Sequence, residues 1–168
     1  MTKKKTIVFS VVGYKNSGKT TLIEKLIAHF KSNKKRVGVI KHDVHKFEID
    51  HQGKDTYRFS AAGADRVLIS AKDKFAMICH TDTETDIEEL ISRTVGGVDI
   101  LITEGYKNHP FPKIEVTRAK TKEELLLFHG ISNVNAVVSD EQIPELNLPL
   151  FKPTEIKEIA EFIMTMKV

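Results

Sequence analysis

The sequence predicts a three-layer α/β fold, in which helices flank a mostly parallel central sheet and a β-hairpin is added. Two observations lead to this prediction. Short β-branched apolar runs alternate with segments whose apolar residues recur at helical spacing, and the buried runs are nearly continuous, as in parallel sheets. The chain has 168 residues, 40% of them hydrophobic, which suits one domain spanning residues 1–168.

The first third of the chain predicts a βαβ unit. Residues 6–12 are β-branched and apolar, and from Lys19 to Phe30 the apolar residues follow helical spacing. Residues 36–41 predict a second strand, expected to be a parallel neighbour of the first because a helix connects the two. The rest of the chain predicts, in order, a short helix over 53–63, a hairpin of strands 67–70 and 75–79, a helix capped by Thr83 or Thr85 that ends near Arg93, buried strands over 98–103, 113–117 and 134–139, and a last amphipathic helix after Pro153.

Charge and cysteine content narrow the function classes. Lysine and arginine total 26 against 23 acidic residues, a net charge of +3 that suits an anionic small ligand. The single cysteine, Cys79, excludes an internal disulfide and favours a cytoplasmic protein. No apolar run approaches the roughly 18 residues that span a bilayer, so no membrane segment is expected. Nothing resembles a nucleic-acid-binding module.

A phosphate-binding loop lies between the first strand and the first helix. Residues 13–20, GYKNSGKT, satisfy the pattern G-x4-G-K-[S/T]. In such a loop backbone N–H groups surround a phosphate, the lysine reaches the β and γ phosphates, and the threonine hydroxyl contacts Mg²⁺. Lys15 is either an additional phosphate contact or a solvated loop charge. The candidate nucleotide-binding residues are Gly13, Lys15, Asn16, Ser17, Gly18, Lys19, Thr20 and Thr21.

Two carboxylates at strand ends are candidates for the metal shell. Asp43 follows the strand over 36–41, and Glu104 follows the strand over 98–103. Nucleoside triphosphatases with this loop need a carboxylate at such a position to hold Mg²⁺ or its water. We predict Lys19, Asp43 and Glu104 as catalytic residues, Thr20, Asp43 and Glu104 as metal ligands, and a close approach of the Gly105 backbone to the γ phosphate. The alternatives are a helix cap for Asp43 and a surface carboxylate for Glu104.

The segment over 42–52 is rich in ionisable residues. His42, His45 and His51, with Asp43, Glu48 and Asp50, could form a zinc or nickel cluster, because imidazole and carboxylate bind these metals. The spacings match no closed structural site. The lining of a nucleotide or substrate cleft is therefore the favoured interpretation.

Four segments together resemble the family of molybdopterin-guanine dinucleotide biosynthesis protein B, MobB. They are GYKNSGKTTL at 13–22, VIKHDVHKFEIDHQGKDTYRFSAAGA at 39–64, ILITEGYK at 100–107 and PKIEVTR at 112–118. The phosphate loop is shared by many NTPases, whereas the other three segments in combination are far more specific. The resemblance spans nearly the whole chain and implies a P-loop NTPase fold.

The resemblance further implies a cytoplasmic, GTP-binding accessory protein that forms a homodimer. Such a protein assists a partner, molybdenum cofactor guanylyltransferase, in joining GMP to molybdopterin, and hydrolyses GTP weakly with Mg²⁺. By position, Gly13, Asn16, Ser17, Gly18 and Lys19 would hold the phosphates, with Thr20, Asp43 and Glu104 around Mg²⁺. Three lysines in or beside the matching motifs could supply charge for the pterin phosphate or the partner, namely Lys54, Lys107 and Lys113.

Several alternatives stay open at this point. Asp140, after the strand over 134–139, could accept hydrogen bonds from a guanine edge or could be a structural cap. A small-molecule kinase would share the phosphate loop, but the five arginines are scattered along the chain. A metallochaperone GTPase would use the His42–His51 segment. For the homodimer, the hairpin predicted over 67–79 offers an edge for pairing between chains.

Overall fold

The computed structural model describes residues 5–42 and 47–166, which divide into two compact units. One unit contains the described residues of 1–42 and 91–168, and the other those of 43–90. No helix in the described part is both long and apolar enough to cross a membrane.

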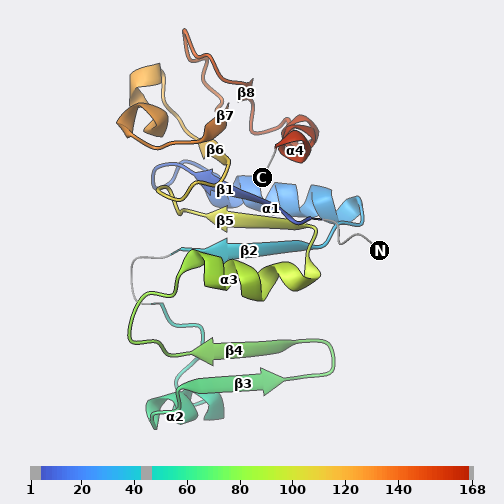
Figure 1. Cartoon of the computed structure of the whole chain (residues 1–168), viewed down its shortest axis with the longest axis vertical. Coiled ribbons are helices and arrows are strands. Elements are labelled where there is room, and N and C mark those ends of the chain that lie inside the picture. Colours follow the sequence, from blue (N-terminus) through green and yellow to red (C-terminus); the bar gives the residue numbers. More distant parts are fainter. Residues whose placement is uncertain (1–4, 43–46, 167–168) are drawn as a thin grey trace. The chain divides into compact units, whose positions relative to one another are not determined.

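The first unit is built on a six-stranded sheet in the order β2-β5-β1-β6-β7-β8, with every pair parallel (Figure 1). The expected parallel α/β sheet is thereby confirmed. Residues 150 and 151 add a short edge strand that the sequence pattern did not predict. The strands are β1 (Ile7–Val12), β2 (Val37–Lys41), β5 (Ile100–Glu104), β6 (Lys113–Val116), β7 (Val134–Val138) and β8 (Leu150–Phe151).

The expectation that the second strand neighbours the first is wrong. Strand β2 is parallel to β1, but β5 lies between them, so that Ile102 is level with both Phe9 and Val39. Burial explains the order. The four apolar or hydroxyl residues of β5 from Ile100 to Thr103 are fully buried and suit the sheet interior, whereas β2 is partly exposed along its length and suits an edge.

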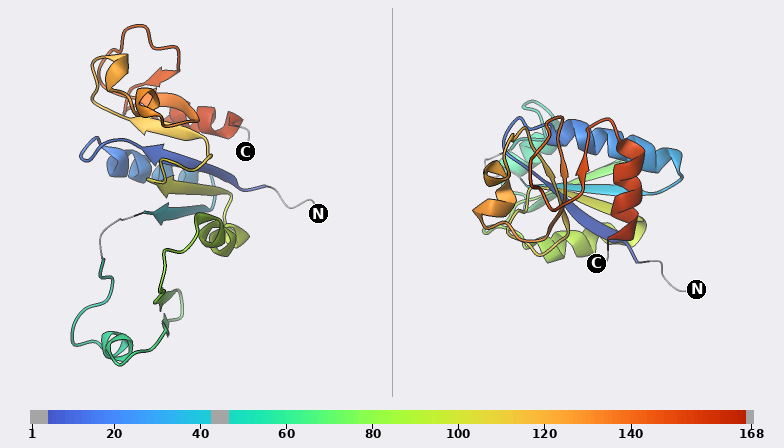
Figure 2. Two further views of the ribbon diagram at one scale, coloured as in Figure 1. Left: turned by 60° about the vertical axis from the view of Figure 1, so that its left-hand side comes forward. Right: turned by 90° about the horizontal axis from the view of Figure 1, so that it is seen from above.

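Helices cover one face of this sheet. Helices α1 (Lys19–Ser32) and α4 (Ile156–Thr165) place Leu22, Leu26, Ile159 and Ile163 in one core with the sheet residues Phe9, Val11, Ile100, Ile102, Ile114 and Val138 (Figure 2). The opposite face carries a second cluster under the 3₁₀ turns η2 (Lys122–Glu124) and η3 (Leu126–His129). These turns were not predicted, because single 3₁₀ turns have no long apolar period.

The second unit contains α2 (Asp55–Ala61) and an antiparallel hairpin of β3 (Arg66–Ser70) and β4 (Phe75–Cys79). Both predictions are confirmed. Helix α3 (Ile87–Thr94) begins in this unit, and its N-terminus is capped by Asp86, whose carboxylate accepts the N–H of Glu88 at 2.9 Å. The expected cap at Thr83 or Thr85 is therefore wrong. The helix gives way to a 3₁₀ turn, η1 (Val95–Gly97), at the predicted glycines.

A candidate nucleotide-phosphate site

The phosphate loop lies at the carboxyl edge of the parallel sheet. Strand β1 is in the interior of the sheet, and the chain runs to one side of it for β2 and β5 and to the other for β6, β7 and β8. Ligands of open parallel sheets bind at the carboxyl ends of the strands where the strand order reverses in this way. Residues 13–18 leave β1 at this point and lead directly into α1.

The backbone of the loop explains its glycines. A Cβ on Gly13 would lie 2.2 Å from the carbonyl oxygen of Val116 and 2.7 Å from the hydroxyl of Ser17, so that no other residue fits there. Asn16 and Gly18 adopt left-handed backbone angles, with φ of 62° and 102°. Asparagine tolerates this region better than most residues, and glycine does so without cost. The loop therefore wraps tightly before α1 begins at Lys19.

Lys19 is folded back onto its own loop. Its ammonium group donates a hydrogen bond of 2.8 Å to the carbonyl oxygen of Tyr14. Partial burial lowers the pKa of Lys19, the carboxylate of Glu104 opposes this, and the ammonium groups of Lys107 and Lys41 reinforce it. The structure thus brings the predicted residues Lys19 and Glu104 into one site, and adds two further lysines to it.

Glu104 is held at the end of β5 by pairing on both sides. It is level with Val11 of β1 and with Lys41 of β2, and its carbonyl accepts the N–H of His42 at 3.0 Å. The next residue, Gly105, extends the β1–β5 ladder, because its backbone N–H donates a hydrogen bond of 3.1 Å to the carbonyl oxygen of Val11. The strand therefore ends rigidly beside the phosphate loop, and the predicted carboxylate is half-buried there.

The donor atoms of this edge suit a phosphate and a hard cation. The hydroxyl of Ser17 is buried inside the loop and has no hydrogen-bond partner among the described residues, as expected for a donor that awaits an oxyanion. Thr20 is exposed in the first turn of α1. A hydroxyl and a carboxylate are oxygen ligands of the kind that Mg²⁺ prefers. The residues present therefore fit a nucleotide phosphate chain with its metal.

Comparison with known proteins identifies the family. The family model described as MobB, Molybdopterin guanine dinucleotide synthesis protein B, matches residues 8–140. The chain belongs to the MobB family. The molybdopterin-guanine dinucleotide biosynthesis adapter protein of Haemophilus influenzae is 32% identical over 159 residues, which cover 93% of this chain and 86% of that protein. The corresponding adapter protein of Escherichia coli is 30% identical over 163 residues, covering 94% and 91%.

Solved MobB structures share the fold. A crystal structure of molybdopterin-guanine biosynthesis protein B matches with a TM-score of 0.77 at 29% identity, covering 94% of this chain and 98% of the other. A MobB homologue from Bacillus stearothermophilus matches with a TM-score of 0.72 at 25% identity, covering 94% of both chains. The predicted P-loop NTPase fold is therefore confirmed for this MobB chain.

Some of the residues predicted for the site of this MobB protein are not found together in the structure. Asp43 and His45 lie outside the described residues. Within the ranges 5–42 and 47–166, no three histidine, cysteine or acidic side chains lie close enough together to hold a metal ion. Lys15 lies in the loop with its side chain exposed.

Two further predictions change in the structure. Lys113 is fully buried, and its ammonium group donates to the carbonyl oxygens of His109 and of Phe111, the latter at 3.0 Å. It therefore shapes the β5–β6 loop from inside instead of offering charge to a ligand. After β7, the hydroxyl of Ser139 accepts the N–H of Glu141 at 3.1 Å, while Asp140 lies exposed. The structural cap at this turn is thus Ser139, and Asp140 stays a candidate guanine contact.

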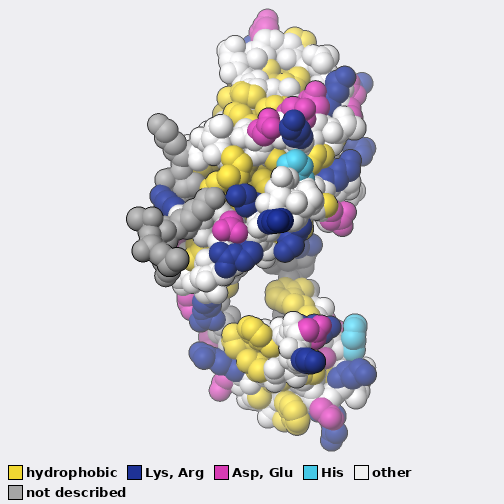
Figure 3. All heavy atoms as spheres, turned by 90° about the vertical axis from the view of Figure 1, so that its right-hand side faces the viewer, with side chains coloured by type: hydrophobic (Ala, Val, Ile, Leu, Met, Phe, Trp, Pro, Cys, Tyr) yellow, Lys and Arg dark blue, Asp and Glu magenta, His cyan; other side chains and the backbone are white. Residues whose placement is uncertain are grey.

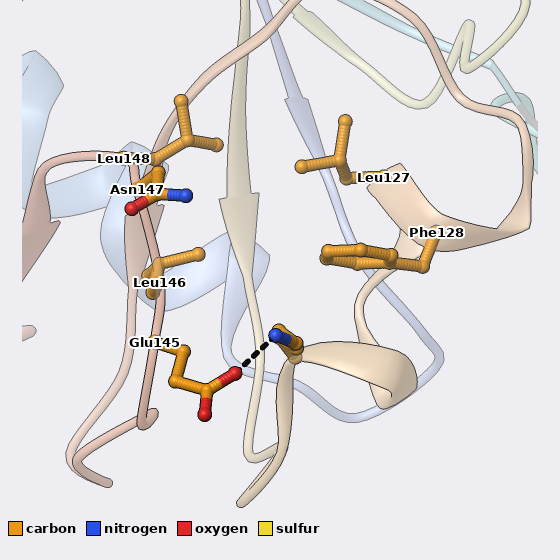
Figure 4. Close-up of a pocket in the computed structure, with 7 residues that line it drawn as sticks. Leu127, Phe128, Glu145, Leu146, Asn147 and Leu148 are labelled. Carbon is orange, nitrogen blue, oxygen red and sulfur yellow. Dashed lines mark hydrogen bonds and ion pairs between the residues drawn. The ribbon is translucent and has the colours of Figure 1, made fainter.

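A separate pocket of about 330 Å³ lies between the 3₁₀ turns and the segment before β8 (Figure 4). Leu127 and Phe128 line one side, and Leu146 and Leu148 face them from the other. An ion pair between Lys122 and Glu145 lies at its end. The lining is mainly apolar, in contrast to the lysine-rich phosphate loop.

Sequence reasoning missed the aromatic contacts that Tyr14 and Tyr106 make at this site. The ring of Tyr14 lies under the ammonium group of Lys107, with 5.3 Å between the nitrogen and the ring centroid. Tyr106 is buried, and its ring contacts those of His42 at 4.8 Å and His109 at 5.5 Å. The motif E-G-Y-K after β5 pointed to Tyr106 and Lys107. Only the fold, however, brings Lys107 to Tyr14.

Proposed function

We propose that this chain is a GTP-binding adapter in molybdenum cofactor biosynthesis, which binds Mg²⁺-GTP at its phosphate loop. The observation that carries the proposal is the assembly of Lys19, Glu104 and the orphaned Ser17 hydroxyl at one sheet edge in a MobB chain. Relatives named molybdopterin-guanine dinucleotide biosynthesis adapter proteins supply the pathway. The partner is a guanylyltransferase that joins GMP to molybdopterin.

Each site residue has a role in this proposal. Backbone N–H groups of residues 13–18 and the hydroxyl of Ser17 hold phosphate oxygens, and Lys19 leaves the Tyr14 carbonyl to reach the β and γ phosphates. Thr20 and Glu104 hold Mg²⁺ directly or through water, together with Asp43. The metal neutralises charge on the phosphate chain.

Hydrolysis is expected to be slow. Fast GTPases orient the attacking water with a glutamine and stabilise the transition state with an arginine. The segment that follows Glu104 reads GYKNHPFP and contains neither residue. Arg36 lies at the other end of β2, where its backbone N–H and its guanidinium group contact Asp99. Nucleotide binding, more than turnover, is thus the proposed activity.

Homodimer formation is part of the proposal. A two-stranded hairpin is marginally stable alone, and both strands of this one expose apolar side chains, including Leu68 at 58% and Phe75 at 72%. Figure 3 shows hydrophobic side chains at the surface of both units. The hairpin sheet contains only β3 and β4 among the described strands, so each has an edge without a strand partner. A second copy of this chain would pair such an edge and cover the apolar side chains.

Calorimetric titration with GTP and ATP, with and without Mg²⁺, tests nucleotide binding. We expect a Mg²⁺-dependent preference for GTP that Lys19→Ala abolishes and that the exposed loop substitution Lys15→Ala reduces far less. Circular dichroism must show that both variants are folded. A dissociation constant unchanged by Lys19→Ala would refute the site, and a preference for ATP would refute the guanine assignment.

The adapter role needs a second assay. Purified guanylyltransferase from the same source is incubated with molybdopterin and Mg²⁺-GTP, and the dinucleotide product is quantified with and without this protein. We expect more product in its presence and no gain with the Lys19→Ala variant. If the unaltered protein and the Lys19→Ala variant gave equal amounts of product, a nucleotide-dependent adapter would be contradicted.

A further inference from the structure

Tyr14 engages two lysines of the site at once. Its carbonyl oxygen accepts a hydrogen bond from the ammonium group of Lys19 at 2.8 Å, while its ring lies 5.3 Å from the ammonium nitrogen of Lys107. The Tyr14 side chain is itself 49% exposed, so the contact with Lys107 lies at the surface of the phosphate loop. Both ammonium groups are thus held by the loop through contacts that a phosphate oxygen could replace.

The loop that carries Lys107 is held in an unusual conformation. Gly105 and Tyr106 have φ values of 92° and 51°, so two consecutive residues are left-handed. A tyrosine in this region is strained, and such strain persists where the surrounding structure enforces it, often at functional sites. Burial of Tyr106 between the rings of His42 and His109 supplies that enforcement. The direction in which the next residue, Lys107, leaves the loop is therefore fixed.

The same loop is also fixed after Lys107. The buried ammonium group of Lys113 donates hydrogen bonds to the carbonyl oxygens of His109 and Phe111. The backbone N–H of His109 donates to the carbonyl oxygen of Tyr106 at 3.2 Å. Residues 106 and 109 to 113 are thereby restrained. A ligand-driven change at Lys107 is expected to stay local, in the side chain and its contact with Tyr14.

Charge in the site is unbalanced in favour of an anion. The ammonium groups of Lys107 and Lys41 lie close enough to Lys19 to act on its charge, and the carboxylate of Glu104 acts on it with the opposite sign. Partly buried like charges repel, and a polyanion relieves that repulsion. Lys19 is the residue that reaches the β and γ phosphates in loops of this kind. Lys107 follows the end of β5, the neighbour of β1, and its charge acts on Lys19, so it is a candidate for a second contact with these phosphates.

We propose that Lys107 reads the terminal phosphate of the bound nucleotide, leaving the Tyr14 ring to bind that phosphate and thereby distinguishing a triphosphate from a diphosphate. The inference rests on the proposed nucleotide binding and adds the residue that senses the nucleotide state. A charge-assisted hydrogen bond to phosphate is stronger than contact with a half-exposed aromatic ring, so the exchange is favourable with a triphosphate. With a diphosphate, Lys107 stays on Tyr14.

The first test compares affinities for a non-hydrolysable GTP analogue, the β,γ-imido triphosphate, and for GDP, each with Mg²⁺. For Lys107→Met we expect roughly tenfold weaker triphosphate binding with GDP affinity within about twofold of the unaltered protein, a loss typical of one phosphate contact. The matched control is Lys31→Met, which removes an exposed lysine from the last turn of α1, outside the phosphate loop, and should leave the ratio of the two affinities unchanged.

The outcomes separate this inference from the proposed function. If the unaltered protein bound neither nucleotide, or bound both without regard to Lys19→Ala, the proposed function itself would fail. If Lys19→Ala abolished binding while Lys107→Met weakened both nucleotides equally or neither, only the role of Lys107 would be refuted.

A second measurement follows the Tyr14 ring directly. The chain has no tryptophan, so Tyr14→Trp introduces a single indole, which can be excited apart from the remaining tyrosines and keeps an aromatic face for Lys107. We expect the triphosphate analogue to change its emission more than GDP does, and the difference to disappear when Lys107→Met is added. Equal responses to both nucleotides, or a difference that survives Lys107→Met, would overturn the proposal.

Discussion

Glu115 of β6 accepts a hydrogen bond from the backbone N–H of Leu126, with 2.7 Å between the carboxylate oxygen and the nitrogen. The contact ties the 3₁₀ turn η3 to the sheet face that it covers. Glu115 is fully buried, and its second carboxylate oxygen has no partner within the described residues. Burial raises the pKa of Glu115, against the opposing effect of the N–H groups of Leu126 and Leu127.

This burial predicts a pH-dependent stability. The pKa of Glu115 is higher in the folded protein than in the unfolded chain, so the folded protein binds this proton more tightly. The free energy of unfolding therefore falls as the pH rises from the unfolded to the folded pKa of Glu115. We expect the free energy of unfolding of Glu115→Gln, relative to the unaltered protein, to increase with pH across this window by at most about 1.4 kcal/mol per pH unit. Urea unfolding from pH 4 to 8 measures it, with the exposed Glu123→Gln as a control. A relative stability that is flat in pH would contradict the prediction.

The hydroxyls of Ser10 and Thr103 form a buried pair between β1 and β5, 2.7 Å apart. Thr103→Val removes one partner and leaves the other hydroxyl buried and unpaired, which costs about 1–3 kcal/mol of unfolding free energy. The double substitution Ser10→Ala with Thr103→Val should cost less than the sum of the two single changes, as a double-mutant cycle would show. Strict additivity would mean that the pair contributes nothing.

Gly13 has no room for a side chain, because an added Cβ would approach a backbone oxygen to 2.2 Å. We expect Gly13→Ala to destabilise the protein by about 2 kcal/mol or more and to remove nucleotide binding, since the loop must shift. Gly96→Ala is the matched control, because no atom lies within 4 Å of the added Cβ. Thermal unfolding and titration with GTP check both variants, and similar results for both would show that the loop tolerates the shift.

If two copies of the chain pair through the β3–β4 hairpin, a charged side chain placed in that interface should disrupt the dimer. Phe75 and Leu68 are exposed in the chain alone, so a lysine in place of Phe75 costs little in an isolated protomer but places a charge in an apolar interface. We expect Phe75→Lys to shift sedimentation from dimer toward monomer, whereas Lys72→Ala in the hairpin turn leaves it unchanged. A monomer in the unaltered protein would refute the dimer.

Much of the fold followed from local patterns in the sequence. Strand β1, helix α1, the hairpin and α4 were predicted because apolar period and turn residues act over a few neighbours. The phosphate loop was predictable because its pattern occupies eight consecutive residues, although the lack of room at Gly13 also depends on Val116 of β6. The family followed from motifs that each occupy a short stretch.

The structure determined what depends on residues far apart in the chain. The place of β5 between β1 and β2 was not evident locally, because burial over the whole sheet decides strand order. Lys113 carried a charge that suggested exposure, yet the fold buries it against two carbonyl groups. The contact between Tyr14 and Lys107 joins positions 93 residues apart, and a sequence cannot indicate such a contact until two strand ends meet at one edge. Local patterns thus determined the elements and the loop motif, whereas long-range packing decided the strand order and which charges surround the loop.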